Sequence, residues 1–188
     1  MSTPRRPDAL ERLWTPHRMS YVTGGEAAPE RDPDLPECPF CRITADPATS
    51  ADDALVVRRG SAAYAVLNLY PYNSGHLMVL PYRHVADLDA LTPEESAELM
   101  SLTQEALRAL RAISQPHAFN VGLNLGGPAG GSLSGHLHQH VVPRWSGDAN
   151  FMTVVAGTKT LPQLLEDTRD LLVEAWDEAQ RAAVPGVG

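Results

Sequence analysis

Three histidines at alternate positions are the residues of this sequence best suited to chemistry. They are His136, His138 and His140, followed by Val141-Val142-Pro143. The run predicts a β-strand, in which alternate side chains emerge on one face, so the three imidazoles would lie within about 13 Å. We expect catalysis or metal binding here, because each buried imidazole in a purely structural row would need its own hydrogen-bond partner.

The three imidazoles can take different roles in a nucleophilic attack on phosphorus. A neutral imidazole with one nitrogen held and the other exposed is a good nucleophile. We interpret the middle ring, His138, as the candidate nucleophile because its neighbours can fix its tautomer. His140 could support the leaving group, and His136 could orient its neighbour or bind a metal ion.

A glycine-rich segment lies directly before the histidines. It contains Gly126, Gly127, Gly130 and Gly131, and Ser132 follows. Glycines let the backbone approach a ligand closely with its N–H groups directed inward. Such a segment is often only a turn, but its position here predicts a phosphate cradle that includes Gly131 and Ser132.

The two cysteines of the chain form a compact pair, Cys38-Pro39-Phe40-Cys41. A redox-active pair of this spacing would sit between a strand and a helix, and nothing strand-like precedes Cys38. A zinc site is the favoured interpretation, provided that two more ligands come from elsewhere in the chain. The alternative is a pair of reduced, packed cysteines.

The composition bounds the class of protein. The 188 residues suit one domain with a tail, and the sequence shows neither a long apolar run nor a signal peptide, so we expect a cytoplasmic protein. The net charge of −8 argues against a nucleic acid or a membrane surface as partner. A phosphate-bearing small substrate remains open, since it needs only local donors.

The chain divides into an arm, a domain and a short tail. Residues 1–36 are rich in proline, glycine and charge, and we expect an N-terminal arm there, a domain over 37–180 and a tail over 181–188. Alternation and turn residues predict the strands 54–58, 62–68, 76–80, 119–125 and 136–142. Helices are expected from Thr92, which begins a capping box, and from about Pro162. This order predicts an α+β fold, an antiparallel sheet with two main helices.

Two segments resemble the signature of the histidine triad (HIT) family of nucleotide hydrolases and transferases. His136-Leu-His-Gln-His-Val-Val is similar to the triad itself, and Asn68-Leu-Tyr-Pro-Tyr-Asn-Ser-Gly-His-Leu-Met-Val-Leu-Pro81 to the family's Asn…Pro…Gly-His…Pro segment. The match spans about Cys38 to Trp145. It implies an antiparallel sheet with helices and a homodimer or higher homo-oligomer, commonly formed by joining sheets. Where the family mostly has a hydrophobic residue this chain has Gln139, which should affect structure only.

The resemblance also implies roles for individual residues. His138 would attack the α-phosphorus and become nucleotidylated, with Asn124 holding the α-phosphate or the surroundings of His138, and Asn68 contacting the ribose. Trp145 could stack on adenine, or equally pack in a core or interface. His76 would lie under the site, or be a packed strand residue.

The position of Ser132 bears on the acceptor. Hydrolases of the family commonly have glutamine there, whereas Gly131-Ser132 resembles the diadenosine tetraphosphate phosphorylase branch of actinobacterial type. That resemblance implies phosphorolysis of diadenosine tetraphosphate to ATP and ADP, with inorganic phosphate as the partner substrate and a divalent cation allowed on the polyphosphate. Arg144 or Lys159 could supply positive charge, or be solvated.

Three alternatives stay open. A hydrolase or phosphoramidase of the same family would use another acceptor or leaving group. A nucleotide-binding signalling module would not need turnover, and a zinc-stabilised interaction module would not need His138 and His140. Some members of the family bind structural zinc through two cysteines and two histidines, and the resemblance implies Cys38, Cys41, His84 and His136 as that set.

Overall fold

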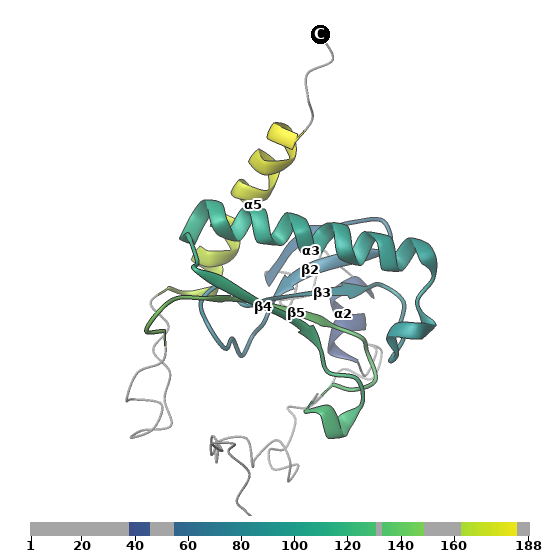
Figure 1. Ribbon diagram of the computed structural model, residues 1–188. Coiled ribbons are helices and arrows are strands. Elements are labelled where there is room, and N and C mark those ends of the chain that lie inside the picture. Colours follow the sequence, from purple (N-terminus) through teal and green to yellow (C-terminus); the bar gives the residue numbers. More distant parts are fainter. Residues whose placement is uncertain (1–37, 46–54, 131–132, 149–162, 184–188) are drawn as a thin grey trace, which may run out of the picture.

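A computed structural model of the chain describes residues 38–45, 55–130, 133–148 and 163–183 (Figure 1). The expected N-terminal arm lies outside the described residues, as do Gly131, Ser132 and Lys159. No helix in the described part of the chain is long and apolar enough to cross a membrane.

Five strands form one antiparallel sheet in the order β1-β2-β3-β5-β4. All five lie where the sequence predicts a strand, and their bounds are β1 Val56–Arg59, β2 Ala63–Leu67, β3 Leu77–Pro81, β4 Ala118–Leu123 and β5 Gln139–Arg144. The order places β5 between β3 and β4. The residues that continue the histidine run are therefore central in the sheet, and β4 is an edge strand.

Helices cover both faces of the sheet. The two predicted helices, α3 (Pro93–Ser114) and α5 (Leu165–Ala183), pack on each other, and α3 also packs on β2, β3 and β5. The short α2 (Pro39–Ala45) lies on the other face, with Phe40 and Ile43 in a separate apolar cluster over β1–β3. Two 3₁₀ turns, η3 (Leu88–Ala90) and η4 (Gly127–Ala129), complete the described elements. The prediction of an α+β fold is confirmed, with α2 as an additional helix.

Helix α3 begins as its sequence predicts. The Thr92 side chain accepts the N–H of Glu95, and the Glu95 carboxylate accepts the N–H of Thr92, which completes a capping box with Pro93 at the first position. Leu102 and Leu110 on its apolar face are buried in the main core. The helix thus packs against one face of the sheet, including β5.

The prediction of one strand over 136–142 is wrong at its start, because β5 begins at Gln139. In the register of β3 and β5, Val79 faces Gln139, so Pro81 falls opposite Leu137. Proline has no N–H for the ladder, and the N–H of Leu137 bonds instead to the carbonyl of Val85 at 2.6 Å. His136 and His138 therefore lie in the segment that leads into the strand.

The side chains from His136 to Val141 nevertheless alternate between the two faces of the sheet. Leu137 and Val141 are buried in the core beneath α3, and the Gln139 amide donates to Thr103 of that helix at 2.6 Å. The three histidines point to the opposite face, where Phe40 of α2 contacts the rings of His136 and His138. Gln139 thus lies on the face away from the triad, as the alternation of side chains along a strand predicts.

Candidate active site and metal centre

His138 presents one unprotonated nitrogen. Its Nδ1 lies 2.7 Å from the main-chain oxygen of His136, and a carbonyl oxygen only accepts, so Nδ1 carries the proton. The lone pair is then on Nε2. The ring is 7% exposed and packs against Phe40 at 5.3 Å between centroids. A held, neutral imidazole with a bare Nε2 is suited to attack an electrophile.

A second hydrogen-bond chain fixes His140 from beneath. The N–H of Tyr72 donates to Nδ1 of His76 at 3.0 Å, so the proton of His76 is on Nε2. That Nε2 lies 3.0 Å from Nδ1 of His140, which must accept. His140 therefore keeps its own proton on Nε2.

The surroundings hold His140 neutral. Burial, and then the neighbouring His138, lower the pKa of His140 to about 4. The rings of His138 and His140 are 5.0 Å apart and nearly perpendicular. With both rings neutral, the pair offers one lone pair and one N–H donor, a combination that suits attack on phosphorus with support of an oxygen.

His76 is the residue of this site that sequence reasoning undervalued. It is fully buried, and its ring contacts both Tyr72 and His140. The register of the structure places it there, because Met78 pairs with His140 across β3 and β5. Residues two apart share a face, so His76 lies on the face of the triad.

The three predicted substrate-binding residues that the structure describes lie at different distances from the histidines. Asn68 lies beside the hydrogen-bond chain, with Nδ2 at 3.3 Å from Nδ1 of His76. Asn124 lines an open pocket of about 350 Å³ together with His140. Trp145 lies five residues beyond His140, roughly 16 Å along the chain, and donates its indole N–H to the carbonyl of Ser114 at 3.2 Å. The structure does not bring Trp145 into that pocket.

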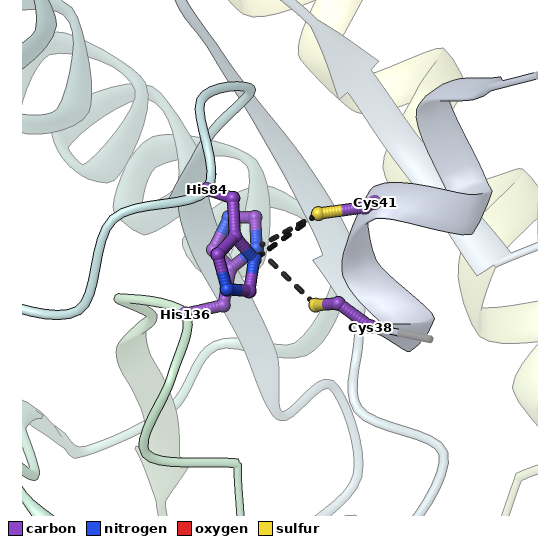
Figure 2. Close-up of side chains that lie close together, drawn as sticks. All are labelled: Cys38, Cys41, His84 and His136. Atoms are coloured by element: carbon purple, nitrogen blue, oxygen red, sulfur yellow. Dashed lines mark hydrogen bonds between the residues drawn. The ribbon is translucent and has the colours of Figure 1, made fainter. Parts of the chain in front are cut away.

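The four predicted metal ligands converge (Figure 2). One ligand atom from each of Cys38, Cys41, His84 and His136 lies within 4.8 Å of the others. Nδ1 of His136 is 3.4 Å from Sγ of Cys38 and 3.5 Å from Sγ of Cys41, and Nδ1 of His84 is 3.3 Å from the latter. Two thiolates and two imidazoles are a donor set typical of a structural zinc site.

The tautomer of His136 fits a metal ligand. Its Nε2 is 2.9 Å from the carbonyl of Pro81, so Nε2 carries the proton and the lone pair on Nδ1 faces the sulfurs. Burial lowers the pKa of His136, which favours its neutral form. Burial and the adjacent Cys38 raise the pKa of the Cys41 thiol to about 11. A bound cation would displace the proton of this thiol.

The metal centre and the candidate nucleophile share two structural links. The main-chain oxygen of His136 holds Nδ1 of His138, and Phe40, between the two cysteines, packs against both rings. A cation held by Cys38 and Cys41 would therefore also fix Phe40 and the main chain of His136, which contact the ring of His138.

Comparisons with known proteins agree with this geometry. The family model described as "HIT domain" matches residues 49–147. The AP-4-A phosphorylase of Mycobacterium tuberculosis H37Rv is 59% identical over 169 residues, which are 90% of this chain and 86% of that protein. Among solved structures, a Zn-bound histidine triad family protein from Mycobacterium smegmatis is 27% identical with a TM-score of 0.63, over 78% of this chain and 97% of that one. A uridylyltransferase mutant shares the fold, with a TM-score of 0.60 over 87% of this chain and 51% of that one, at 22% identity. The chain belongs to the histidine triad (HIT domain) family.

Proposed function

We propose that this protein is a nucleotidyltransferase that cleaves diadenosine tetraphosphate with inorganic phosphate, giving ATP and ADP. The observation that carries the chemistry is the fixed tautomer of His138, which leaves Nε2 unprotonated. The choice of substrate is supported by the relative from Mycobacterium tuberculosis, which is named an AP-4-A phosphorylase and matches nine-tenths of this chain.

In the first step, Nε2 of His138 attacks the α-phosphorus. A nitrogen–phosphorus bond forms while the bond from that phosphorus to the bridging oxygen breaks, and ATP leaves with the bond's electrons. The proton stays on Nδ1 of His138, which donates it to the carbonyl oxygen of His136, and this hydrogen bond stabilises the cationic adenylyl-imidazole. The N–H on Nε2 of His140 is the donor placed to support an oxygen of the reacting phosphate.

In the second step, an oxygen of inorganic phosphate attacks the same phosphorus. The nitrogen–phosphorus bond breaks, its electrons return to Nε2 of His138, and ADP is formed. Two in-line displacements let one site serve ATP as leaving group and phosphate as acceptor in turn. Throughout, His76 acts as a positioning residue that keeps the proton of His140 on Nε2.

The other predicted contacts complete the proposed site. Asn124 would hold the α-phosphate and Asn68 the ribose, while the loop with Gly131 and Ser132 would receive the acceptor phosphate. These assignments rest on the family resemblance, together with the position of Asn124 beside His140 in one pocket. A contact between Trp145 and adenine would require the substrate to reach the residue that follows β5, or a second subunit to complete the site there.

We further propose that Cys38, Cys41, His84 and His136 hold a structural zinc ion. The donor set and the tautomer of His136 support this, and a zinc-bound member of the family has the same fold. The ion would stabilise the fold and anchor α2. The attacking, donating and positioning groups are the chain's own histidines.

A homodimer or higher homo-oligomer fits the edge of the sheet. Strand β4 is an edge strand, in which Val121 is 47% exposed, and Leu125 just beyond its end is 44% exposed. Exposed apolar side chains on an unpaired edge favour pairing with another chain. A second copy of the same strand is the simplest such partner.

Product analysis tests the proposed reaction. The protein is incubated with diadenosine tetraphosphate, with and without inorganic phosphate, and the nucleotides are separated. The proposal predicts equal amounts of ATP and ADP that depend on phosphate. AMP in place of ADP, with phosphate present, would assign the protein to the hydrolases of the family.

A further inference from the structure

We infer that the pocket between Tyr72 and β4 binds the distal nucleoside of the dinucleotide, the half that leaves as ATP. The inference rests on the proposed function, and it names a subsite that the histidines and the metal centre do not include. Four side chains of the pocket carry the argument: Tyr72, Asn120, His140 and Arg144.

The pocket begins at the reacting end of the site. In the ladder between β4 and β5, Gly122 faces His140 and Ala118 faces Arg144. The pocket therefore follows β5 for four residues, or about 13 Å, away from His140. Helix α2 packs over β1–β3, on the other side of His138. A dinucleotide with its α-phosphorus at His138 can extend its leaving half along this groove.

The lining suits a nucleoside. The pocket's volume of about 350 Å³ lies within the range of small-molecule sites, which starts near 300 Å³. Tyr72 is 48% exposed and contributes an aromatic ring beside His140. Asn120 contributes a side-chain amide, which can pair with the donor and acceptor edge of adenine. Stacking and amide pairing are the contacts that a base needs.

The charge at the Arg144 end of the pocket favours a nucleoside over a phosphate. Arg144 is the one basic side chain among the described lining residues other than the neutral His140. Its Nε and Nη2 donate to the carboxylate of Asp148 at 2.6 and 3.0 Å, and its Nη1 donates to Oδ1 of Asn120 at 2.8 Å. The guanidinium is thus largely neutralised, and a neutral ligand suits such a wall.

Gly122 keeps the floor of the pocket open. A Cβ added there would meet no atom within 4 Å, and its φ lies outside the left-handed region, so no packing or turn requires glycine. Directly paired residues point to the same face, so a side chain at Gly122 would project beside His140 into the pocket. A glycine inside a strand often marks the close approach of a ligand.

The test uses two variants and two substrates. Diadenosine tetraphosphate and adenosine 5′-tetraphosphate share the bond to be cleaved, but the second lacks the distal nucleoside. Gly122→Val fills the pocket with a strand-forming side chain. We expect kcat/KM for the dinucleotide to fall at least about tenfold, while that for adenosine tetraphosphate changes less than about twofold. Asn120→Ala should show the same selectivity to a smaller degree, and it removes side-chain volume instead of adding it.

The outcomes separate the subsite from the proposed function. An equal fall for both substrates, in both variants, would overturn the subsite, as would no fall for either. A wild-type protein that forms no ADP from diadenosine tetraphosphate would overturn the proposed function itself, and the subsite with it. A selective loss for the dinucleotide alone supports the inference.

Discussion

Nε2 of His76 lies 3.0 Å from Nδ1 of His140, and this contact joins β3 to the triad. Because Nδ1 of His76 accepts the N–H of Tyr72, the bond has a fixed direction, from His76 to His140. The proton of His140 is consequently set by a residue 64 positions away in the chain. The working unit is therefore the rings of His138 and His140 plus a third ring, His76, directly before β3.

This relationship predicts a specific defect in His76→Phe. Phenylalanine fills the buried space but cannot donate, so His140 can place its proton on Nδ1 and lose its donor toward substrate. We expect kcat to fall roughly 100-fold with a small change in KM. Steady-state kinetics measure this, with His117→Ala as a control histidine outside the site. A variant with unchanged kcat would remove His76 from the mechanism.

Removal of the nucleophile should abolish the covalent step and spare binding. His138→Ala is expected to lower turnover at least roughly 1,000-fold, because it removes the nitrogen that attacks the phosphorus in the proposed first step. Titration calorimetry should still detect nucleotide binding. Turnover near the wild-type rate would contradict the assignment and favour a mechanism without His138.

The metal centre predicts a defined zinc content. Wild-type protein should carry about one zinc ion per chain, and Cys41→Ser should lose most of it, measured by plasma mass spectrometry. Zinc at 100 times its dissociation constant would add about 2.7 kcal/mol to the free energy of unfolding, so the variant should melt at a lower temperature. His117→Ala should keep its zinc, since His117 lies outside the cluster. Equal zinc in wild type and Cys41→Ser would refute the site.

The pKa of His140 predicts a loss of stability in acid. In the unfolded chain this histidine titrates near 6.5 and in the folded protein near 4. Between these pH values the unfolded state binds one more proton at this histidine than the folded state does. The contribution of His140 to stability is therefore fully present above pH 6.5 and is lost as the pH drops toward 4. The loss from this residue is about 3 kcal/mol at most.

The matched variant for this effect is His140→Asn. Its side-chain oxygen can still accept from His76, but it does not titrate. Urea unfolding at pH 7 and pH 4.5 should show a smaller loss of stability in the variant than in wild type. Equal losses would assign the acid sensitivity to other groups.

The face that carries the chemistry was predictable because it depends on local periodicity. Alternation places His136, His138 and His140 on one side whether or not the whole run is a strand. The start of β5 was not predictable in the same way. It depends on Pro81, which reaches the position opposite Leu137 only through the register of β3 and β5.

Long-range contacts account for what sequence reasoning missed. Helix α2 is seven residues long, too short for a periodic pattern, and a helix of this length depends on packing and on its cysteine contacts. The cluster of Cys38 and His136, which are 98 positions apart, followed from family resemblance and could not be derived from spacing. His76 was named in the sequence, but its partner His140 became visible only in the paired strands.

The central claim is that an adenylyl group on His138 is transferred to inorganic phosphate. The most direct measurement is a chase. The protein is mixed with diadenosine tetraphosphate without phosphate, the adenylylated peptide is located by mass spectrometry, and phosphate is then added. The proposed mechanism predicts a modified His138 whose adenylyl group is recovered as ADP. Recovery of that group as AMP, or a modification at another residue, would contradict it.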